Sequence, residues 1–276
     1  MARSSGRLLI FGLGYTASAV AVRLGDWEVM ATGSAGSLAF DDVAGVAQAI
    51  GWATHILSSV PPVEDDAVLA AYGDQLRGSG AWLGYLSSTG VYGDAEGAWV
   101  DENTPITGRR AARNRADADW LAMGARVFRL PGIYGPGRSP IDRVRDGRAH
   151  RTGIAGKVFS RVHVDDIASG VIAGFDAPPG AYNLADDEPA SQDAVVDFAA
   201  RLLGVAPPPV VPLDQLSPEA RAFHAENRRV SNAKAKRVLG WRPAYPTYRF
   251  GLRALSAMTS PTAASAAPPI VSPDQR

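Results

Sequence analysis

Short aliphatic runs alternate with amphipathic stretches along the first half of the chain. The runs have the length and residue types of buried strands, and the apolar residues of the stretches recur at helical spacing. Strands are expected at 8–11, 27–32, 37–40, 54–60, 81–87 and 125–130. Helices are expected from the first turn to about residue 24 and at about 43–50, 64–76 and 108–123. This alternation predicts an α/β fold with a doubly wound parallel sheet.

The pattern changes after Pro131. Turns fill 132–138 and a basic helix-like stretch follows at 141–148. A strand passes into a helix within 160–167, where Asp165 or Asp166 is expected to cap the helix. Another strand is expected at 181–184, with helices at 191–203 and 231–239. We therefore expect a first domain at 1–133, completed by about 161–182, a smaller C-terminal domain mainly within 134–256, and a flexible tail at 257–276.

A glycine turn joins the first expected strand to the first expected helix. Its residues are Gly12-Leu13-Gly14-Tyr15-Thr16-Ala17, a G-x-G-x-x-A pattern. The first glycine allows the sharp turn, the second lets a pyrophosphate approach the backbone, and the small alanine lets the helix pack on the strand. The helix N-terminus then offers unpaired N–H groups to phosphates. The turn predicts a dinucleotide-binding Rossmann domain with cofactor contacts at Gly12, Gly14, Tyr15 and Thr16; a structural turn without a ligand is the alternative.

The ends of the next strands bear on which dinucleotide is bound. Thr32-Gly33-Ser34 ends the second strand with hydroxyl groups and no carboxylate, which favours NADP slightly over NAD. Ligands of doubly wound sheets lie beyond the carboxyl ends of the strands. Thr32 and Ser34 are therefore candidate cofactor contacts, and the others are Asp41, Ser58, Ser59, Val60 and Pro131. Ordinary turn and cap roles are the alternative.

Composition argues against several other classes of protein. The 28 basic and 28 acidic residues balance, so no net charge attracts nucleic acid or an anionic membrane. No apolar run reaches the about 18 residues of a membrane span, and residues 1–6 lack the apolar stretch of a secretory leader. Cysteines are absent and the four histidines are far apart, so neither disulfides nor a zinc site is expected. We expect a cytoplasmic protein.

Several motifs follow one another in the order typical of one superfamily. Besides the glycine turn, they lie at 87–93, 129–137, 161–167, 182–184, 231–232 and 239–241. Over about residues 7–250 the chain resembles the extended short-chain dehydrogenase/reductases, the group that contains nucleotide-sugar epimerases and dehydratases. The resemblance implies an NAD(P) cofactor, hydride transfer, and a substrate domain formed mainly by the C-terminal third.

The chain departs from this superfamily at the catalytic pair. Members use Tyr-x-x-x-Lys, in which the lysine lowers the pKa of the tyrosine toward neutral pH. Alignment with the family places Ala111 at the tyrosine and Arg115 at the lysine, and Phe11 takes the place of the first glycine of the longer family turn. These departures resemble the atypical branch of the superfamily, whose members often keep the cofactor fold without the tyrosine.

The candidate catalytic residues are Ser88, Tyr92 and Arg115. Ser88 precedes Tyr92 by four residues, as the family's catalytic serine does, and the resemblance makes it the residue that orients the substrate. Tyr92 could replace the missing phenol, and Arg115 could bind ribose, nicotinamide or substrate oxygens but cannot exchange protons near neutral pH. A turn hydroxyl is the alternative for Ser88, and a packed aromatic ring is the alternative for Tyr92.

The candidate substrate contacts are Arg138, Arg161 and Asn183. The family often binds a substrate phosphate at these two arginines, and guanidinium groups hold phosphates and carboxylates with paired hydrogen bonds. Pairing with neighbouring carboxylates is the alternative for both. We interpret His163 as a core hydrogen-bonding residue and the basic stretch 109–115 as a solvated helix face.

Two hypotheses follow for the function. The first is an NAD(P)-dependent oxidoreductase or epimerase/dehydratase that acts on a small or nucleotide-linked substrate. The second is a sensor or regulatory protein that keeps the cofactor and has lost catalysis. The expected partner is a small molecule, with no nucleic acid or membrane, and a homodimer is left open.

Overall fold

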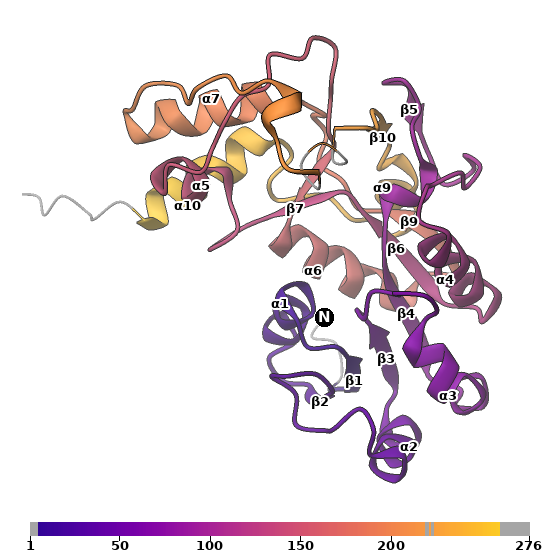
Figure 1. The fold of residues 1–276 in the computed structure, drawn as a ribbon. Helices are drawn as coiled ribbons and strands as arrows, with labels where there is room; N and C mark the ends of the chain where they lie inside the picture. The colour runs from indigo at the N-terminus through magenta and orange to yellow at the C-terminus, as the bar shows by residue number, and fades with distance from the viewer. Residues whose placement is uncertain (1–4, 219–220, 222–223, 260–276) are drawn as a thin grey trace, which may run out of the picture.

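The computed structural model describes residues 5–218, 221 and 224–259. A parallel sheet forms its centre (Figure 1) and, within the described residues, contains six strands in the order β2-β1-β3-β4-β6-β9. Their bounds are β1 Arg7–Phe11, β2 Glu28–Ala31, β3 His55–Ser58, β4 Trp82–Ser88, β6 Arg126–Leu130 and β9 Gly180–Asn183. The expected doubly wound α/β fold is confirmed. The chain leaves β1 for β2 on one side and then crosses to β3 on the other, so a ligand crevice is expected at the carboxyl end of β1.

Helices cover both faces of the sheet (Figure 1). One face carries α1 (Tyr15–Arg23) and α6 (Val164–Ala173); the other carries α2 (Val43–Trp52), α3 (Ala67–Gly78) and α4 (Ala111–Ala122). In β1, Leu8 and Ile10 belong to the core under α1 and α6, whereas Leu9 and Phe11 belong to the core on the opposite face. All four side chains are fully buried because successive strand residues point to opposite faces and both faces are covered.

The expected strand at 37–40 is wrong. Only Leu38 pairs in this segment, through one isolated bridge with Thr32. The apolar side chains still face the core, since the Phe40 ring lies against Phe11 and Tyr72 with centroids 6.3 and 5.4 Å apart. A loop is enough to bring them there, because Gly33 and Gly36 lie in the turns just before the segment and α2 follows it at Val43.

The expected cap of α6 by Asp165 or Asp166 is also wrong. Nδ1 of His163 accepts the N–H of Asp165 at 3.2 Å and caps the helix. Asp166 accepts the N–H groups of Ala244 and Tyr245 at 2.6 and 3.1 Å, which fastens the C-terminal segment to α6.

A second group of elements has a core of its own. It includes two short sheets, β5 paired with β10 and β7 paired with β8, and helices α5, α7 and α10, which Figure 1 shows together on the side away from α2 and α3. Their bounds are β5 Trp99–Val100, β7 Gly132–Tyr134, α5 Pro140–Arg145, β8 Arg161–His163, α7 Gln192–Leu203, β10 Arg229–Val230, α9 Ala233–Val238 and α10 Tyr248–Thr259. Short 3-10 turns lie at Thr89–Tyr92, Gly174–Asp176 and Leu213–Gln215. The core shared by β7, α5, α7 and α10 contains Tyr134, Phe198 and Leu252. The strands β5 and β10 contribute Val100 and Val230 to a separate small cluster.

Every helix in the described ranges is too short or too polar to cross a lipid bilayer. The expected tail at 257–276 lies outside the described residues beyond Thr259.

Candidate functional site

The glycine turn between β1 and α1 faces open space. Gly12 has a φ of +83°, which residues with a side chain rarely adopt. Thr32 holds the turn, because its Oγ1 accepts the N–H of Gly12 at 3.1 Å and its carbonyl accepts the N–H of Leu13 at 2.8 Å. Apart from Gly14 itself and the adjoining residues of the chain, no atom of the described residues lies within 4 Å of the position that a Cβ of Gly14 would take. The turn therefore leaves room at the N-terminus of α1.

A cavity of about 360 Å³ lies over this turn, and we call it the smaller cavity. The sequence candidates that line it are Gly14, Tyr15, Thr16, Ser59, Ser88, Pro131 and Arg138. The guanidinium of Arg138 lies 5.6 Å from the centroid of the Tyr15 ring, and the Tyr15 hydroxyl donates to the carbonyl of Pro136 at 3.1 Å. These contacts bring a cation from the loop between β7 and α5 to the glycine turn.

The other candidate cofactor contacts support the turn or lie at the surface. Thr32 is buried, and its hydroxyl oxygen already accepts the N–H of Gly12. Ser58 is fully buried, and the side chain of Val60 would lie 2.9 Å from a Cβ on Gly12. Ser34 is exposed just after β2, and Asp41 is exposed in the loop before α2. None of these five residues lines the smaller cavity.

A second cavity of about 700 Å³ adjoins the first, and we call it the larger cavity. Both cavities are lined by Ser88, Arg110, Arg113, Leu130 and Pro131, so they form one continuous cleft. The Oγ of Ser88 accepts the N–H of Gly90 at 3.1 Å. Since this bond uses a lone pair, the hydroxyl proton of Ser88 is available for a ligand. Ser88 thus lies where the two cavities join, and its hydroxyl can donate a hydrogen bond to a ligand.

Tyr92 and Asn183 lie in the core instead of the cleft. The Tyr92 hydroxyl donates to Oδ1 of Asn183 at 2.7 Å and accepts from Nη1 of Arg129 at 3.0 Å. The side-chain amide of Asn183 also donates to the carbonyl of Ser231, and its backbone N–H donates to a carboxylate oxygen of Glu102. Burial raises the pKa of Tyr92 to about 12, although Arg129 opposes the shift. Neither residue lines the smaller or the larger cavity, so the structure favours the packing role for Tyr92.

Arg115 also points away from the cleft. Its Nη2 donates to the carbonyl of Glu64 at 2.6 Å and lies 3.3 Å from Oδ1 of Asp65, in the loop before α3. Other basic residues at the start of α4 line the cavities instead: Arg109, Arg110 and Arg113. Arg109 and Arg110 are exposed, as a solvated face requires, but they and Arg113 also line the cavities. Arg113 and Arg115 are two residues apart, about 200° around a helix, so they face different neighbours.

Arg161 lines the larger cavity from β8. Its Nη1 donates to the carbonyls of Phe159 and Ala190 at 2.8 and 2.9 Å, and only 7% of the residue is exposed. Burial raises the pKa of neighbouring Asp186 to about 8, with Arg161 opposing the shift. The three candidate substrate contacts are thus separated: Arg138 lies at the smaller cavity, Arg161 at the larger one and Asn183 in the core.

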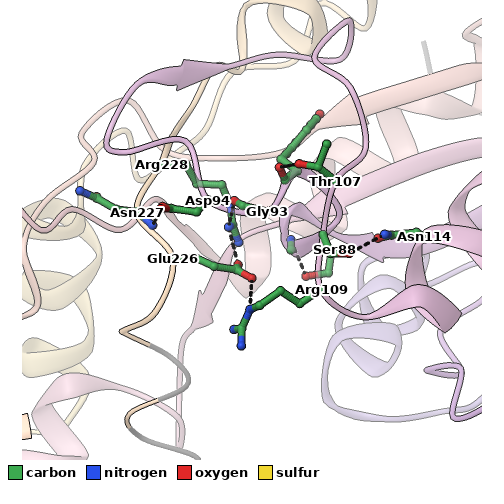
Figure 2. Close-up of polar contacts among 12 residues, drawn as sticks. Ser88, Gly93, Asp94, Thr107, Arg109, Asn114, Glu226, Asn227 and Arg228 are labelled. Carbon is green, nitrogen blue, oxygen red and sulfur yellow. Dashed lines mark hydrogen bonds and ion pairs between the residues drawn. The ribbon is translucent and has the colours of Figure 1, made fainter.

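Sequence reasoning missed Glu226 and Arg228, which line the larger cavity with Ser88 and are drawn with it in Figure 2. Glu226 lies between Arg109 and Arg228, with distances of 2.8 Å to Nε of Arg109 and 2.5 Å to Nη1 of Arg228. All three side chains line the larger cavity. In the sequence, only the basic stretch at 109–115 pointed to Arg109, and no motif marked 226–228.

Comparison with known proteins places the chain in a family. No family model matches it. A functionally unknown conserved protein of Silicibacter pomeroyi is 41% identical, over 92% of this chain and 99% of that one, with a TM-score of 0.81. A human epimerase family protein, whose structure is with NADPH, has a TM-score of 0.73 at 15% identity over 91% of this chain and 99% of its own.

Curated relatives match a shorter stretch. A 3-diazoavenalumate denitrifying reductase of a Streptomyces species is 32% identical over 141 residues, which are 46% of this chain and 45% of that protein. The chain spans about half the length of the curated relatives it matches. The likeness to the Silicibacter pomeroyi protein covers nearly both chains, so the chain belongs to the same family as that protein, with the fold of the NAD-dependent epimerase/dehydratase-like, atypical short-chain dehydrogenase/reductases.

Proposed function

We propose that the protein is an NAD(P)-dependent oxidoreductase of epimerase/dehydratase-like type that acts on a small or nucleotide-linked substrate. The observation that carries the proposal is the continuous cleft, in which the smaller cavity at the glycine turn meets the larger cavity at Ser88. The reductase among the relatives supports a redox reaction, and the human structure with NADPH supports the cofactor.

The residues of the smaller cavity fit a dinucleotide. The missing side chain at Gly14 leaves a space that a Cβ would narrow, and the first turn of α1 has N–H groups without intrahelical acceptors. Arg138 adds a positive charge beside Tyr15, at the start of α1. The hydroxyl of Ser34 and the absence of a carboxylate at the end of β2 favour NADP over NAD.

The residues of the larger cavity fit a substrate that changes charge. When bound, the nicotinamide supplies or accepts a hydride. A carbonyl substrate that gains a hydride develops negative charge on its oxygen, which Ser88 stabilises as a donor and Arg110 and Arg113 stabilise as cations. Arginine stays charged at neutral pH, so the proton comes from water; Arg110 is exposed, so water reaches this point of the cleft.

One observation favours the second candidate, a cofactor-binding sensor. Neither Tyr92 nor Arg115 lies in the cleft, and Tyr15, the one tyrosine among the described lining residues, already donates its hydroxyl proton to the carbonyl of Pro136. Such a protein would bind NADPH or NADH and turn over no substrate. Binding and turnover therefore have to be measured separately.

Titration of the whole chain with NADPH and NADH, followed by cofactor fluorescence, tests the shared part of the proposal. Gly14→Val should weaken binding by about tenfold or more, or about 1.4 kcal/mol, because the valine fills the smaller cavity. Gly51→Val in α2 is the control, since its Cβ also meets open space and lies outside both cavities. Equal affinity of Gly14→Val and the unaltered protein would refute the cofactor site. Reduction of any carbonyl compound in a broad panel then favours the enzyme over the sensor.

A further inference from the structure

The larger cavity carries an excess of positive charge. Five arginines line it, Arg109, Arg110, Arg113, Arg161 and Arg228, and Glu226 is the one acidic residue among the described lining residues. In the described part of the chain, Arg110 and Arg113 form no ion pair with a carboxylate. A cleft with this balance attracts an anion.

Glu226 already occupies two of these guanidinium groups. Figure 2 shows its carboxylate between Arg109, which precedes α4, and Arg228, which precedes β10. One oxygen lies 2.8 Å from Arg109 and the other 2.5 Å from Arg228. Burial raises the pKa of Glu226, but the hydrogen bonds from Arg228 and Arg109 outweigh burial and lower it, so the carboxylate is charged at neutral pH.

The backbone is held at the residue that follows Glu226, so a displacement of the carboxylate would be a movement of the Glu226 side chain. The N–H of Asn227 donates to Asp94 at 2.6 Å, and the carbonyl of Asn227 accepts from Gly97 at 2.8 Å. Arg228 is held independently, because its Nη1 also donates to the carbonyl of Gly93 at 2.5 Å. Loss of the carboxylate would therefore leave Arg228 in place.

The pair of guanidinium groups lies close to the proposed reaction centre. A Cβ built on Gly90 would lie 3.3 Å from Oγ of Ser88 and 4.0 Å from Nη2 of Arg228. An anionic group bound by Arg228 would thus place the neighbouring part of the same molecule near the Ser88 hydroxyl. The arrangement suits a substrate with an oxyanion a few bonds from the reacting carbon.

We propose that Glu226 is an internal occupant of the substrate's anion site, and that a carboxylate or phosphate of the substrate displaces it from Arg109 and Arg228. The inference rests on the proposed function for the identity of the larger cavity as the substrate site. A substrate oxyanion forms charge-assisted hydrogen bonds of the same kind with the same donors. Glu226 would then discriminate against neutral ligands, which gain nothing from its displacement.

Calorimetric titration of the cofactor-free full chain with inorganic phosphate, and separately with acetate, tests the proposal. Glu226→Gln should bind one of these anions about tenfold more tightly than the unaltered protein, the scale of one lost competing ion pair. Glu226→Asp keeps the charge but is one methylene too short to bridge both arginines, so it should give a smaller gain in the same direction. Arg228→Met should bind about tenfold more weakly.

Asp74→Asn is the matched control, because it removes a carboxylate paired with Arg77 on the exposed face of α3. A gain for phosphate alone or for acetate alone supports the proposal and identifies the substrate's anionic group. Unchanged affinities for both anions in Glu226→Gln and Glu226→Asp would overturn it and leave the three residues as a tie between segments. NADPH titration of the same samples keeps this failure distinct from a failure of the proposed function.

Discussion

The phenol of Tyr92 donates a hydrogen bond to Oδ1 of Asn183 at 2.7 Å, and both side chains are almost fully buried. Nη1 of Arg129 donates to the same phenol at 3.0 Å. A phenol with both bonding directions occupied, and with its pKa raised to about 12 by burial, is unsuited to exchange protons with a ligand at neutral pH. This pair therefore links the sheet to the segment around Ser231, which accepts from Asn183.

Tyr92→Phe should lower stability and leave ligand binding intact. The change leaves Oδ1 of Asn183 and a donor of Arg129 without their partner, which costs about 1–3 kcal/mol in the free energy of unfolding. Urea unfolding measures this loss, and fluorescence titration with NADPH should give an unchanged dissociation constant. A variant as stable as the unaltered protein but without turnover would contradict the structural role and return Tyr92 to catalysis.

Arg129 and Asp117 form a buried ion pair that should be costly to break. Nη2 and Nε of Arg129 donate to the two carboxylate oxygens of Asp117 at 2.7 and 3.1 Å, and Ser87 donates to Asp117 at 2.6 Å. Asp117→Ala should lower the free energy of unfolding by about 3–5 kcal/mol, because it leaves a buried cation without a counter-charge. The double change Asp117→Leu with Arg129→Met should recover most of this loss.

The control for this pair is Asp74→Ala, which breaks an ion pair with Arg77 on the surface. Exposed pairs contribute about 0–1 kcal/mol. Equal losses in Asp117→Ala and Asp74→Ala, measured by urea unfolding, would show that burial does not set the cost.

The fold was largely predictable because the strands of a doubly wound sheet are buried on both faces. Runs such as Leu8 to Phe11 show this directly as unbroken aliphatic and aromatic residues. The same rule failed at 37–40, where Phe40 reaches the core from a loop. An apolar run predicts that the side chains are buried, but it does not by itself predict that the backbone forms hydrogen bonds with a neighbouring strand.

The candidate site was predictable where backbone geometry alone decides it. Gly12 is recognisable because its positive φ favours glycine, and Gly14 because the motif leaves open space there for a pyrophosphate. The direction of a long side chain depends on helix phase and on distant partners. Arg115 was chosen by alignment, yet Arg113 faces the cleft. Glu226 and Arg228 come near Ser88 only through tertiary folding.

Ser88→Ala should separate turnover from cofactor binding. The hydroxyl stands where the two cavities meet and does not touch the glycine turn, so the dissociation constant of NADPH should change little. With any carbonyl compound that the protein reduces, kcat should fall by about 100-fold or more, the usual cost of one lost donor to a developing oxyanion. Kinetics under saturating cofactor measure it.

Ser191→Ala is the control for this change. Its hydroxyl also accepts a backbone N–H, that of Ala194 at 3.1 Å, but it caps α7 and lines neither cavity. Ser191→Ala should cost about 0.5–2 kcal/mol of stability and keep kcat. A fully active Ser88→Ala would exclude Ser88 as the donor.

Asp186 should make stability fall as the pH rises. Burial raises its pKa to about 8, and the charge of Arg161 opposes the shift while Asp187 and Glu188 add to it. In the unfolded chain the carboxyl has its ordinary pKa of about 3.9. Between these values the folded protein holds a proton that the unfolded chain has lost, so the free energy of unfolding decreases with rising pH, by up to about 1.4 kcal/mol per pH unit.

Asp186→Asn should therefore flatten the dependence of stability on pH between about 4 and 8, because the amide has no proton to lose. Asp166 titrates in the same range, since burial raises its pKa to about 6. It is unaltered in both proteins, so the difference between their stabilities at each pH isolates Asp186. Urea unfolding at several pH values measures that difference. A constant difference across this range would mean that Asp186 is ionised throughout, as the counter-charge of Arg161 behind the larger cavity.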